Sequence, residues 1–180
     1  MIYFPGVFFL LILVWALTHT KLHRPKGRIV LDKNHYARLL ELAELPLSSS
    51  DVPVGAILLY KGEIIGEGYN TVLRHQKAGE HAEVNAISEA IGRLGMEKFS
   101  ALDRRDLTLV STFEPCLMCA GAFINYNIKH VYFMKEKGLA YSAKEEALFL
   151  RYLASRKQVR NNNEQEALFE RHPGYKTKRR

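Results

Sequence analysis

Two stretches decide the fold of this chain: Glu80-His81-Ala82-Glu83-Val84-Asn85-Ala86-Ile87 and Glu114-Pro115-Cys116-Leu117-Met118-Cys119-Ala120-Gly121. A neutral imidazole and two thiolates can fill three of the four tetrahedral positions around Zn²⁺, and a catalytic zinc keeps the fourth position open for a water. Cys116 and Cys119 are three residues apart, so a helix that opens at Pro115 would place both sulfurs on one face. The pattern predicts a catalytic zinc site with His81, Cys116 and Cys119 as the metal ligands.

Glu83 follows His81 by two residues. Its carboxylate can lie beside a metal-bound water without being a ligand, which is where hydrolysis needs a proton carrier. We therefore predict that Glu83 is the catalytic residue.

Each motif alone is compatible with other roles. A Cys-x-x-Cys pair also occurs in redox motifs and in one half of structural zinc knuckles, and a His-x-Glu pair on a helix is commonly a surface pair. Cys116 and Cys119 are the only cysteines, which excludes a Cys₄ structural site within one chain. A redox motif also does not call for Glu114-Pro115 ahead of it, so the two motifs together favour a zinc hydrolase.

Taken together, His-x-Glu followed by Pro-Cys-x-x-Cys resembles the cytidine deaminase-like superfamily of zinc-dependent deaminases. Residues 51–56 and 66–70 are similar to the first strands of its tRNA-specific adenosine deaminases and their guanine deaminase-like relatives. The resemblance implies that Zn²⁺ is the cofactor and that the exocyclic amine of a nucleobase or nucleoside, of the cytosine, guanine or adenine type, is removed as ammonia. It also implies substrate contacts from Asn70 and Ala82, although Asn70 equally fits an ordinary turn residue. Members of these branches pair through the Cys-bearing helix, so a homodimer is implied as well.

Two departures from the tRNA branch bear on the substrate. That branch has Asp-Pro-Thr-Ala ahead of its histidine, where this chain has Lys77-Ala78-Gly79-Glu80, and its Gly- and Ser-rich segment after the fourth strand is replaced by residues 135–141. Glu80 beside the pocket would also repel phosphate. These features favour a free base or nucleoside as substrate, with tRNA adenosine-to-inosine deamination as the alternative. A catalytically idle, zinc-containing membrane scaffold is a third hypothesis, which would require a fourth protein ligand.

Residues 1–20 contain no Lys, Arg, Asp or Glu, and a helix of about 20 residues can cross a bilayer. Four basic residues between positions 21 and 28 follow directly, and four more close the chain, so the excess behind the net charge of +7 is terminal. By the positive-inside rule the first cluster stays in the cytoplasm, which predicts a single-pass membrane protein with its catalytic domain on the cytoplasmic side. A cleaved signal peptide is the alternative, but no Lys or Arg precedes the apolar run.

The predicted organisation is a transmembrane anchor over 1–20, a basic linker over 21–31, a zinc deaminase domain over 32–160, and a short helix with a basic tail over 161–180. Apolar spacing predicts helices over 32–45, 81–94, 141–159 and 164–171, and strands over 54–60, 63–69, 107–111 and 130–134. Residues 71–80 are expected to form a loop over the pocket. The alternation predicts an α/β fold, a three-layer α/β/α sandwich with a mixed central sheet, after one N-terminal transmembrane helix.

Overall fold

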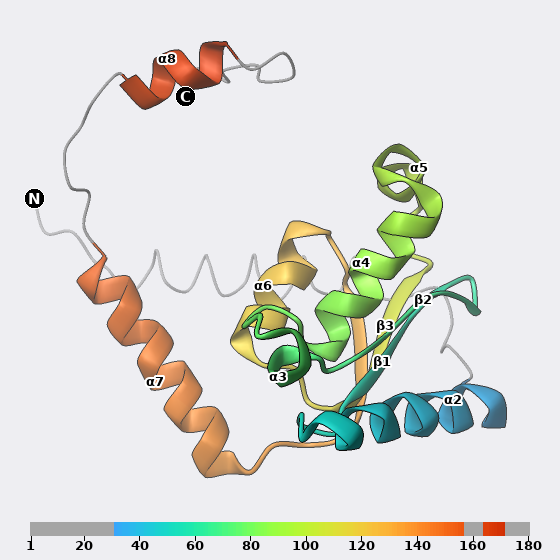
Figure 1. Ribbon diagram of the computed structural model, residues 1–180. Helices are drawn as coiled ribbons and strands as arrows, with labels where there is room; N and C mark the ends of the chain where they lie inside the picture. Colours follow the sequence, from blue (N-terminus) through green and yellow to red (C-terminus); the bar gives the residue numbers. More distant parts are fainter. Residues whose placement is uncertain (1–30, 157–163, 172–180) are drawn as a thin grey trace, which may run out of the picture. The chain divides into compact units, whose positions relative to one another are not determined.

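The computed structural model describes residues 31–156 and 164–171 (Figure 1). The chain divides into two compact units, one that ends at Gly138 and one that begins at Leu139. The first unit contains the sheet and both motifs of the predicted zinc site. The domain boundaries predicted at 32 and 160 stay predictions.

A four-stranded sheet forms the centre of the first unit. Its strands are β1 (Gly55–Tyr60), β2 (Glu63–Tyr69), β3 (Leu107–Phe113) and β4 (His130–Lys135), in the order β2-β1-β3-β4. Strand β1 runs antiparallel to both of its neighbours, whereas β3 and β4 are parallel. The predicted mixed sheet is therefore confirmed, and each strand lies close to its predicted range.

Helices cover both faces of the sheet (Figure 1): α2 (Lys33–Glu44) lies on one face, and α4 (Ala82–Leu94) and α6 (Leu117–Asn125) lie on the other. Successive residues of a strand point to opposite faces, and β1 follows this rule. Ile57 and Leu59 are buried in one cluster with Leu39 of α2. Leu58 is buried in the opposite cluster with Ile87 of α4. The apolar β1 strand thus gives the α/β/α layering expected from the sequence.

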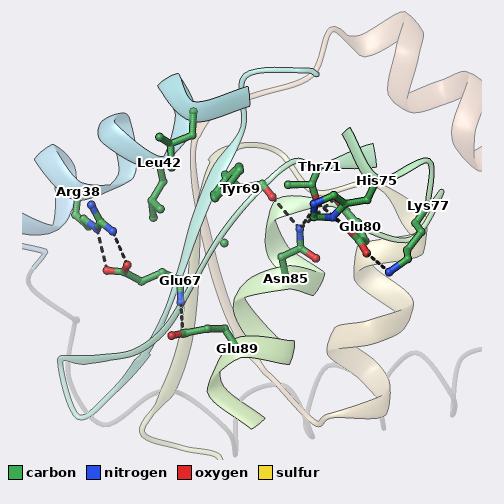
Figure 2. A pocket seen from close by; sticks show the side chains of 12 residues that line it. Arg38, Leu42, Glu67, Tyr69, Thr71, His75, Lys77, Glu80, Asn85 and Glu89 are labelled. Carbon is green, nitrogen blue, oxygen red and sulfur yellow. Dashed lines mark hydrogen bonds and ion pairs between the residues drawn. The ribbon is translucent and has the colours of Figure 1, made fainter. Parts of the chain in front are cut away.

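An ion pair ties α2 to the edge strand β2 (Figure 2). Arg38 donates through Nη2 and Nε to the two carboxylate oxygens of Glu67, at 2.6 and 2.9 Å. The backbone N–H of Glu67 donates to the carboxylate of Glu89 in α4 at 2.8 Å. Strand β2 is therefore held to the helices on both faces of the sheet.

Two glycines let α4 lie directly on β2. A Cβ atom at Gly68 would stand 2.2 Å from the carbonyl oxygen of Ala82, and one at Gly66 would stand 2.2 Å from that of Ala86. No residue with a side chain fits such an approach without backbone movement. The first turn of α4, which carries the His-x-Glu motif, is set against the strand in this way.

The ends of two helices follow the predicted signals. Asp32 is the N-cap of α2: its side chain accepts from the His35 N–H at 3.0 Å, and the His35 ring accepts from the Asp32 N–H at 3.2 Å. This is a reciprocal capping arrangement. Gly95, with φ of 81°, follows the last residue of α4. Both ends agree with the sequence analysis.

Three short helices lie where the sequence predicted none: η1 (Leu45–Ser49), α3 (Val72–His75) and α5 (Met96–Ala101). The expected loop over 71–80 therefore contains one helical turn, α3. Asp51 accepts hydrogen bonds from the backbone N–H groups of Leu73 and Arg74, at 2.5 and 3.1 Å. A single turn is unstable alone, and a carboxylate 22 residues away supplies the missing partner.

The second unit contains α7 (Leu139–Ser155) and α8 (Glu164–Glu170), close to the helices predicted there. No residue of α7 is buried. Within residues 31–156 and 164–171, no helix combines the length and the apolar character needed to cross a bilayer. The predicted anchor over 1–20 and the linker up to residue 30 lie outside the described residues.

Candidate metal centre and active site

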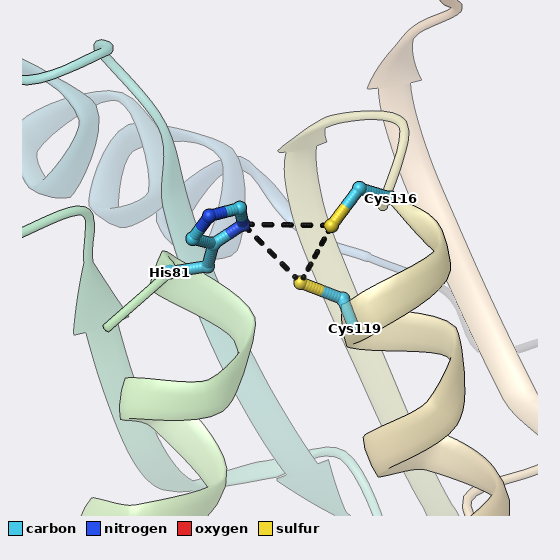
Figure 3. Close-up of side chains that lie close together, drawn as sticks. All are labelled: His81, Cys116 and Cys119. Carbon is cyan, nitrogen blue, oxygen red and sulfur yellow. Dashed lines mark hydrogen bonds between the residues drawn. The ribbon is translucent and has the colours of Figure 1, made fainter. Parts of the chain in front are cut away.

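His81, Cys116 and Cys119 come together at the N-terminal ends of two neighbouring helices (Figure 3). His81 is the N-cap of α4 and Cys116 is the N-cap of α6, while Cys119 lies in the first turn of α6. Helix α6 begins at Leu117 and not at Pro115 as expected, yet both sulfurs still point to the same side. The positive ends of the two helix dipoles therefore meet where thiolate is needed.

The three donor atoms form a triangle with equal sides. Nδ1 of His81 lies 3.6 Å from the sulfur of Cys116 and 3.6 Å from that of Cys119, and the two sulfurs are 3.6 Å apart. Tetrahedral zinc with bonds of about 2.3 Å to sulfur and 2.0–2.1 Å to nitrogen requires donor separations of about 3.5–3.8 Å. The spacing of this candidate metal site therefore fits zinc, with His81 contributing Nδ1.

The three side chains shift one another's pKa values. Contact with the Cys119 thiol and the His81 ring lowers the pKa of Cys116 to about 3. The neighbouring Cys116 sulfur and burial raise the pKa of Cys119, and the same sulfur raises the pKa of His81. Zinc binds thiolate and neutral imidazole, so metal binding at this site releases protons.

Glu83 lies in the first turn of α4 with only 4 % of its surface exposed. Its Oε2 atom accepts a hydrogen bond from the thiol of Cys119 at 3.4 Å. Burial raises the pKa of the Glu83 carboxyl. A buried carboxyl with a raised pKa beside a metal site is suited to accept a proton from a bound water and to release it again.

The two predicted substrate contacts have different surroundings. The Asn70 side chain is buried and bonds to backbone on both sides, donating to the Val52 carbonyl and accepting from the Val72 N–H, each at 3.3 Å. Ala82 is fully buried as the first residue of α4. The first N–H groups of a helix have no acceptor within the helix. Base contacts from Asn70 and Ala82 stay predictions.

Contacts that the sequence did not predict hold the segment leading into Cys116. Lys137 Nζ donates to the Pro115 carbonyl at 2.9 Å, and the Lys137 N–H donates to the Glu114 carboxylate at 2.8 Å. The Glu114 N–H donates in turn to the Lys135 carbonyl at 2.9 Å. In the sequence, residues 135–141 stood out only as a departure from the tRNA branch.

Glu80 is also more constrained than the sequence indicated. The Thr71 hydroxyl, together with His75 and Lys77, holds the pKa of the Glu80 carboxyl at about 2. Lys77 forms an ion pair with this carboxylate, and Nδ1 of His75 lies within hydrogen-bond distance of it. The negative charge of Glu80 is therefore partly balanced, which weakens the repulsion of phosphate that we expected.

Curated relatives match about half of the chain. It is 41% identical over 93 residues to the tRNA-specific adenosine deaminase subunit tad2 of Schizosaccharomyces pombe, which covers 52% of this chain and 23% of the relative. It is 38% identical over 94 residues to the tRNA-specific adenosine deaminase of Buchnera aphidicola, covering 52% of this chain and 59% of the relative. The chain therefore spans less than two thirds of these relatives.

Solved structures of deaminases are also similar to this chain. Guanine deaminase from Bacillus subtilis is similar with a TM-score of 0.59 and 28% identity, over 77% of this chain and 92% of that one. A structure from studies of A-to-I editing by tRNA:A34 deaminases has a TM-score of 0.51 and 29% identity, over 57% of this chain and 75% of that one. The family model for the cytidine and deoxycytidylate deaminase zinc-binding region matches residues 30–135, more than half of the chain, and this protein therefore belongs to that family.

Proposed function

We propose that this chain is a zinc-dependent hydrolytic deaminase that removes the exocyclic amine of a nucleobase or nucleoside and releases ammonia. The observation that supports this most directly is the contact between the buried Glu83 carboxylate and Cys119, one of three donor residues whose spacing fits a zinc ion. Family membership supports zinc as the cofactor. A binding protein would gain nothing from a buried acid at this position.

In the proposed reaction, the zinc ligands and Glu83 have separate roles. Zn²⁺ held by His81, Cys116 and Cys119 would lower the pKa of a coordinated water to about 7. Glu83 is placed to carry two protons in turn, the first from the attacking water to the ring nitrogen and the second from the added hydroxyl group to the departing amine. The oxygen joins the amine-bearing carbon, the C–N bond breaks and ammonia leaves. The Glu83 carboxyl ends each turnover in its starting protonation state.

The number of protein ligands argues against a catalytically idle zinc scaffold. A closed structural site requires four protein ligands. Among the residues that the structure describes, the candidate group contains only His81, Cys116 and Cys119. His75, one candidate for a fourth ligand, bonds to Glu80 through Nδ1, and His130 begins β4 beside Thr108. Three ligands favour an open, catalytic position.

Deamination of adenosine in tRNA is the second candidate. It is favoured by the curated relatives, which are named tRNA-specific adenosine deaminases. The guanine deaminase from Bacillus subtilis, by contrast, matches over a larger share of both chains. The partly balanced charge of Glu80 weakens one argument against a phosphate-bearing substrate. Both substrates use the same zinc site and the same Glu83.

A substrate panel separates these two candidates. The zinc-loaded full chain is incubated with free guanine, cytosine and adenine, with their nucleosides, and with tRNA, and ammonia release is measured. Glu83→Gln is the matched control for every substrate. Release from free bases or nucleosides supports the first candidate, and release from tRNA alone, with inosine in the product, supports the second. No release from any substrate by zinc-loaded protein would overturn the proposed enzyme.

We further propose a homodimer that pairs through α6. Leu117, Met118 and Ile124 of this helix are exposed apolar side chains, and Ile124 is 79% exposed. Light scattering of the purified chain should give the mass of a dimer, and Ile124→Asp should shift it to a monomer. Met96→Asp, at an exposed apolar residue of α5, is the control and should leave the mass unchanged. A wild-type monomer contradicts the pairing.

The membrane anchor over residues 1–20 is supported by its uncharged sequence and by the basic residues that follow it. We propose that it places the deaminase domain on the cytoplasmic side of a membrane. The full chain should sediment with membranes and resist carbonate extraction, whereas a variant without residues 1–20 should not. Protease added outside sealed cells should spare the deaminase domain. Full release of the intact chain by carbonate would exclude the anchor.

A further inference from the structure

Glu80, the residue immediately before His81, is engaged by three side chains of the preceding segment (Figure 2). The Thr71 hydroxyl donates to its Oε2 atom at 2.7 Å, and Nδ1 of His75 lies 2.5 Å from the same oxygen. Lys77 Nζ lies 3.0 Å from the other oxygen, Oε1. Both oxygens of the carboxylate are therefore held, one by a hydroxyl and an imidazole and the other by an ammonium group.

The backbone of Glu80 is fixed as well. Its carbonyl accepts from the Thr71 N–H at 3.0 Å and from the Asn85 side chain at 3.3 Å. Asn85, in the first turns of α4, also donates to the Tyr69 carbonyl at 2.8 Å and to the Thr71 hydroxyl at 3.0 Å. The end of β2, the 71–80 segment and the start of α4 thus meet at the residue that precedes His81.

The position of His81 decides the geometry of the metal site. The two sulfurs come from one helix, α6, whereas His81 is the single donor contributed by the segment before α4. Donors of a metal site must be held within about 0.5 Å of their productive positions. A shift of the His81 backbone would therefore open two of the three sides of the donor triangle at once.

We propose that Glu80 is a positioning residue for the zinc ligand His81. Its carboxylate joins Thr71, His75 and Lys77 into one network, and this network fixes the backbone from which the imidazole reaches the zinc position. Glu80 touches neither the metal nor the reacting atoms. The assignment rests on the proposed zinc deaminase function, because His81 matters in this way only as a metal ligand.

An isolated surface ion pair would not have this effect, because such pairs contribute little to stability. Glu80 differs in two respects. Its partner Thr71 is buried, and Glu80 is joined by a peptide bond directly to the zinc ligand His81. Removing the negative charge should therefore weaken zinc binding while it changes the free energy of unfolding of the metal-free chain only slightly.

The chain offers a matched control at the other end of the same groove (Figure 2). Glu67 is also a partly exposed glutamate in an ion pair, with 28% of its side chain exposed against 21% for Glu80. Its partner Arg38 belongs to α2 and has no contact with the segment before His81 among the hydrogen bonds of the described residues. Glu67→Gln thus removes a comparable charge without touching the ligand.

The experiment compares zinc dissociation constants of the full chain, measured by competition with a chromophoric chelator. Glu80→Gln should weaken zinc binding about tenfold or more, in the range found when groups that orient metal ligands are removed. Glu67→Gln should bind zinc as the wild type does. Cobalt(II) loaded in place of zinc gives a second readout, because its visible absorption changes when the histidine donor moves. The spectrum should differ for Glu80→Gln only.

Each outcome bears on one proposal. Equal zinc affinity and equal cobalt spectra for Glu80→Gln and wild type would overturn the positioning role, while zinc-dependent ammonia release by the wild type would leave the proposed function standing. A wild type that binds no zinc would overturn the function itself. If Glu80→Gln does not fold, the double variant His75→Gln, Lys77→Met keeps the carboxylate and removes two partners. It should weaken zinc binding in the same direction, and unchanged affinity would overturn the positioning role.

Discussion

The Oε2 atom of Glu83 lies 3.4 Å from the sulfur of Cys119, so the buried acid touches the candidate ligand set directly. The two residues come from different helices, α4 and α6, that pack on the same face of the sheet. Burial raises the pKa of the Glu83 carboxyl above that of an exposed glutamate, which favours its protonated form. This contact connects proton transfer to metal binding and leads to the first prediction.

Replacing Glu83 by glutamine should leave zinc bound and nearly abolish turnover. The amide keeps the shape of the side chain, and Glu83 is not a metal ligand, but an amide cannot carry a proton. We expect kcat to fall by about 10²–10⁴-fold, the usual contribution of a positioned acid–base group. Metal analysis of the purified variant and ammonia release on the best substrate test this together. Activity near that of wild type would remove Glu83 from the catalytic role.

Replacing Cys116 or Cys119 by alanine should remove both zinc and stability. Two remaining donors cannot hold zinc tightly, and the free energy of zinc binding is also free energy of folding. We expect the melting temperature of either variant to be lower by at least about 5 °C and to stay unchanged when a chelator is added. The melting temperature of the wild type should fall by a similar amount when the chelator removes its zinc. A wild-type melting curve that does not change when the chelator is added would contradict the metal site.

Gly68→Ala should destabilise the fold and weaken zinc binding at the same time. The added methyl would stand 2.2 Å from the Ala82 carbonyl, so the first turn of α4 must move away from β2 and carry His81 with it. We expect a loss of about 1–3 kcal/mol in the free energy of unfolding, as for other overpacked sites. Denaturant titration and chelator competition measure the two effects.

Gly92→Ala is the control for this variant. Gly92 lies in the same helix, and nothing stands within 4 Å of an added Cβ. Alanine in a helix interior is favoured over glycine by up to about 1 kcal/mol, so this variant should be slightly more stable than wild type. If Gly68→Ala and Gly92→Ala behaved alike, close packing of α4 on β2 would not explain the loss.

The Arg38–Glu67 ion pair should make stability depend on pH in a defined direction. Its hydrogen bonds with Arg38 lower the pKa of the Glu67 carboxyl below the ordinary value of 4.5. The folded chain then binds fewer protons here than the unfolded chain, so the stabilisation is fully present above pH 4.5 and disappears as pH falls through the lower folded value. Glu67→Gln should cost up to about 1 kcal/mol at pH 7 and much less in strong acid. A cost that does not change between neutral and acidic pH would exclude the ion pair as its source.

Short elements show where prediction from the sequence failed. The one-turn helix α3 has no periodic pattern of its own, and its N–H groups are satisfied by Asp51 from a distant loop. Helix nucleation is unfavourable, so a four-residue helix exists only because of such tertiary contacts. The longer elements were predictable because apolar spacing on α4 and the apolar β1 strand already specify which sides are buried.

The residue types of His81, Glu83, Cys116 and Cys119 by themselves predicted a zinc site with an acid beside it, because the ligand preferences of zinc and the need for an acid are local properties. Tertiary structure alone decided that Nδ1 of His81 faces the two sulfurs and that the three sides of the triangle are equal. It alone placed Lys137 against Pro115 and Thr71 against Glu80. The physical reason is that each contact depends on how the chain folds back on itself, and that the distances between His81 and the two sulfurs are set by the packing of α4 and α6 on one sheet.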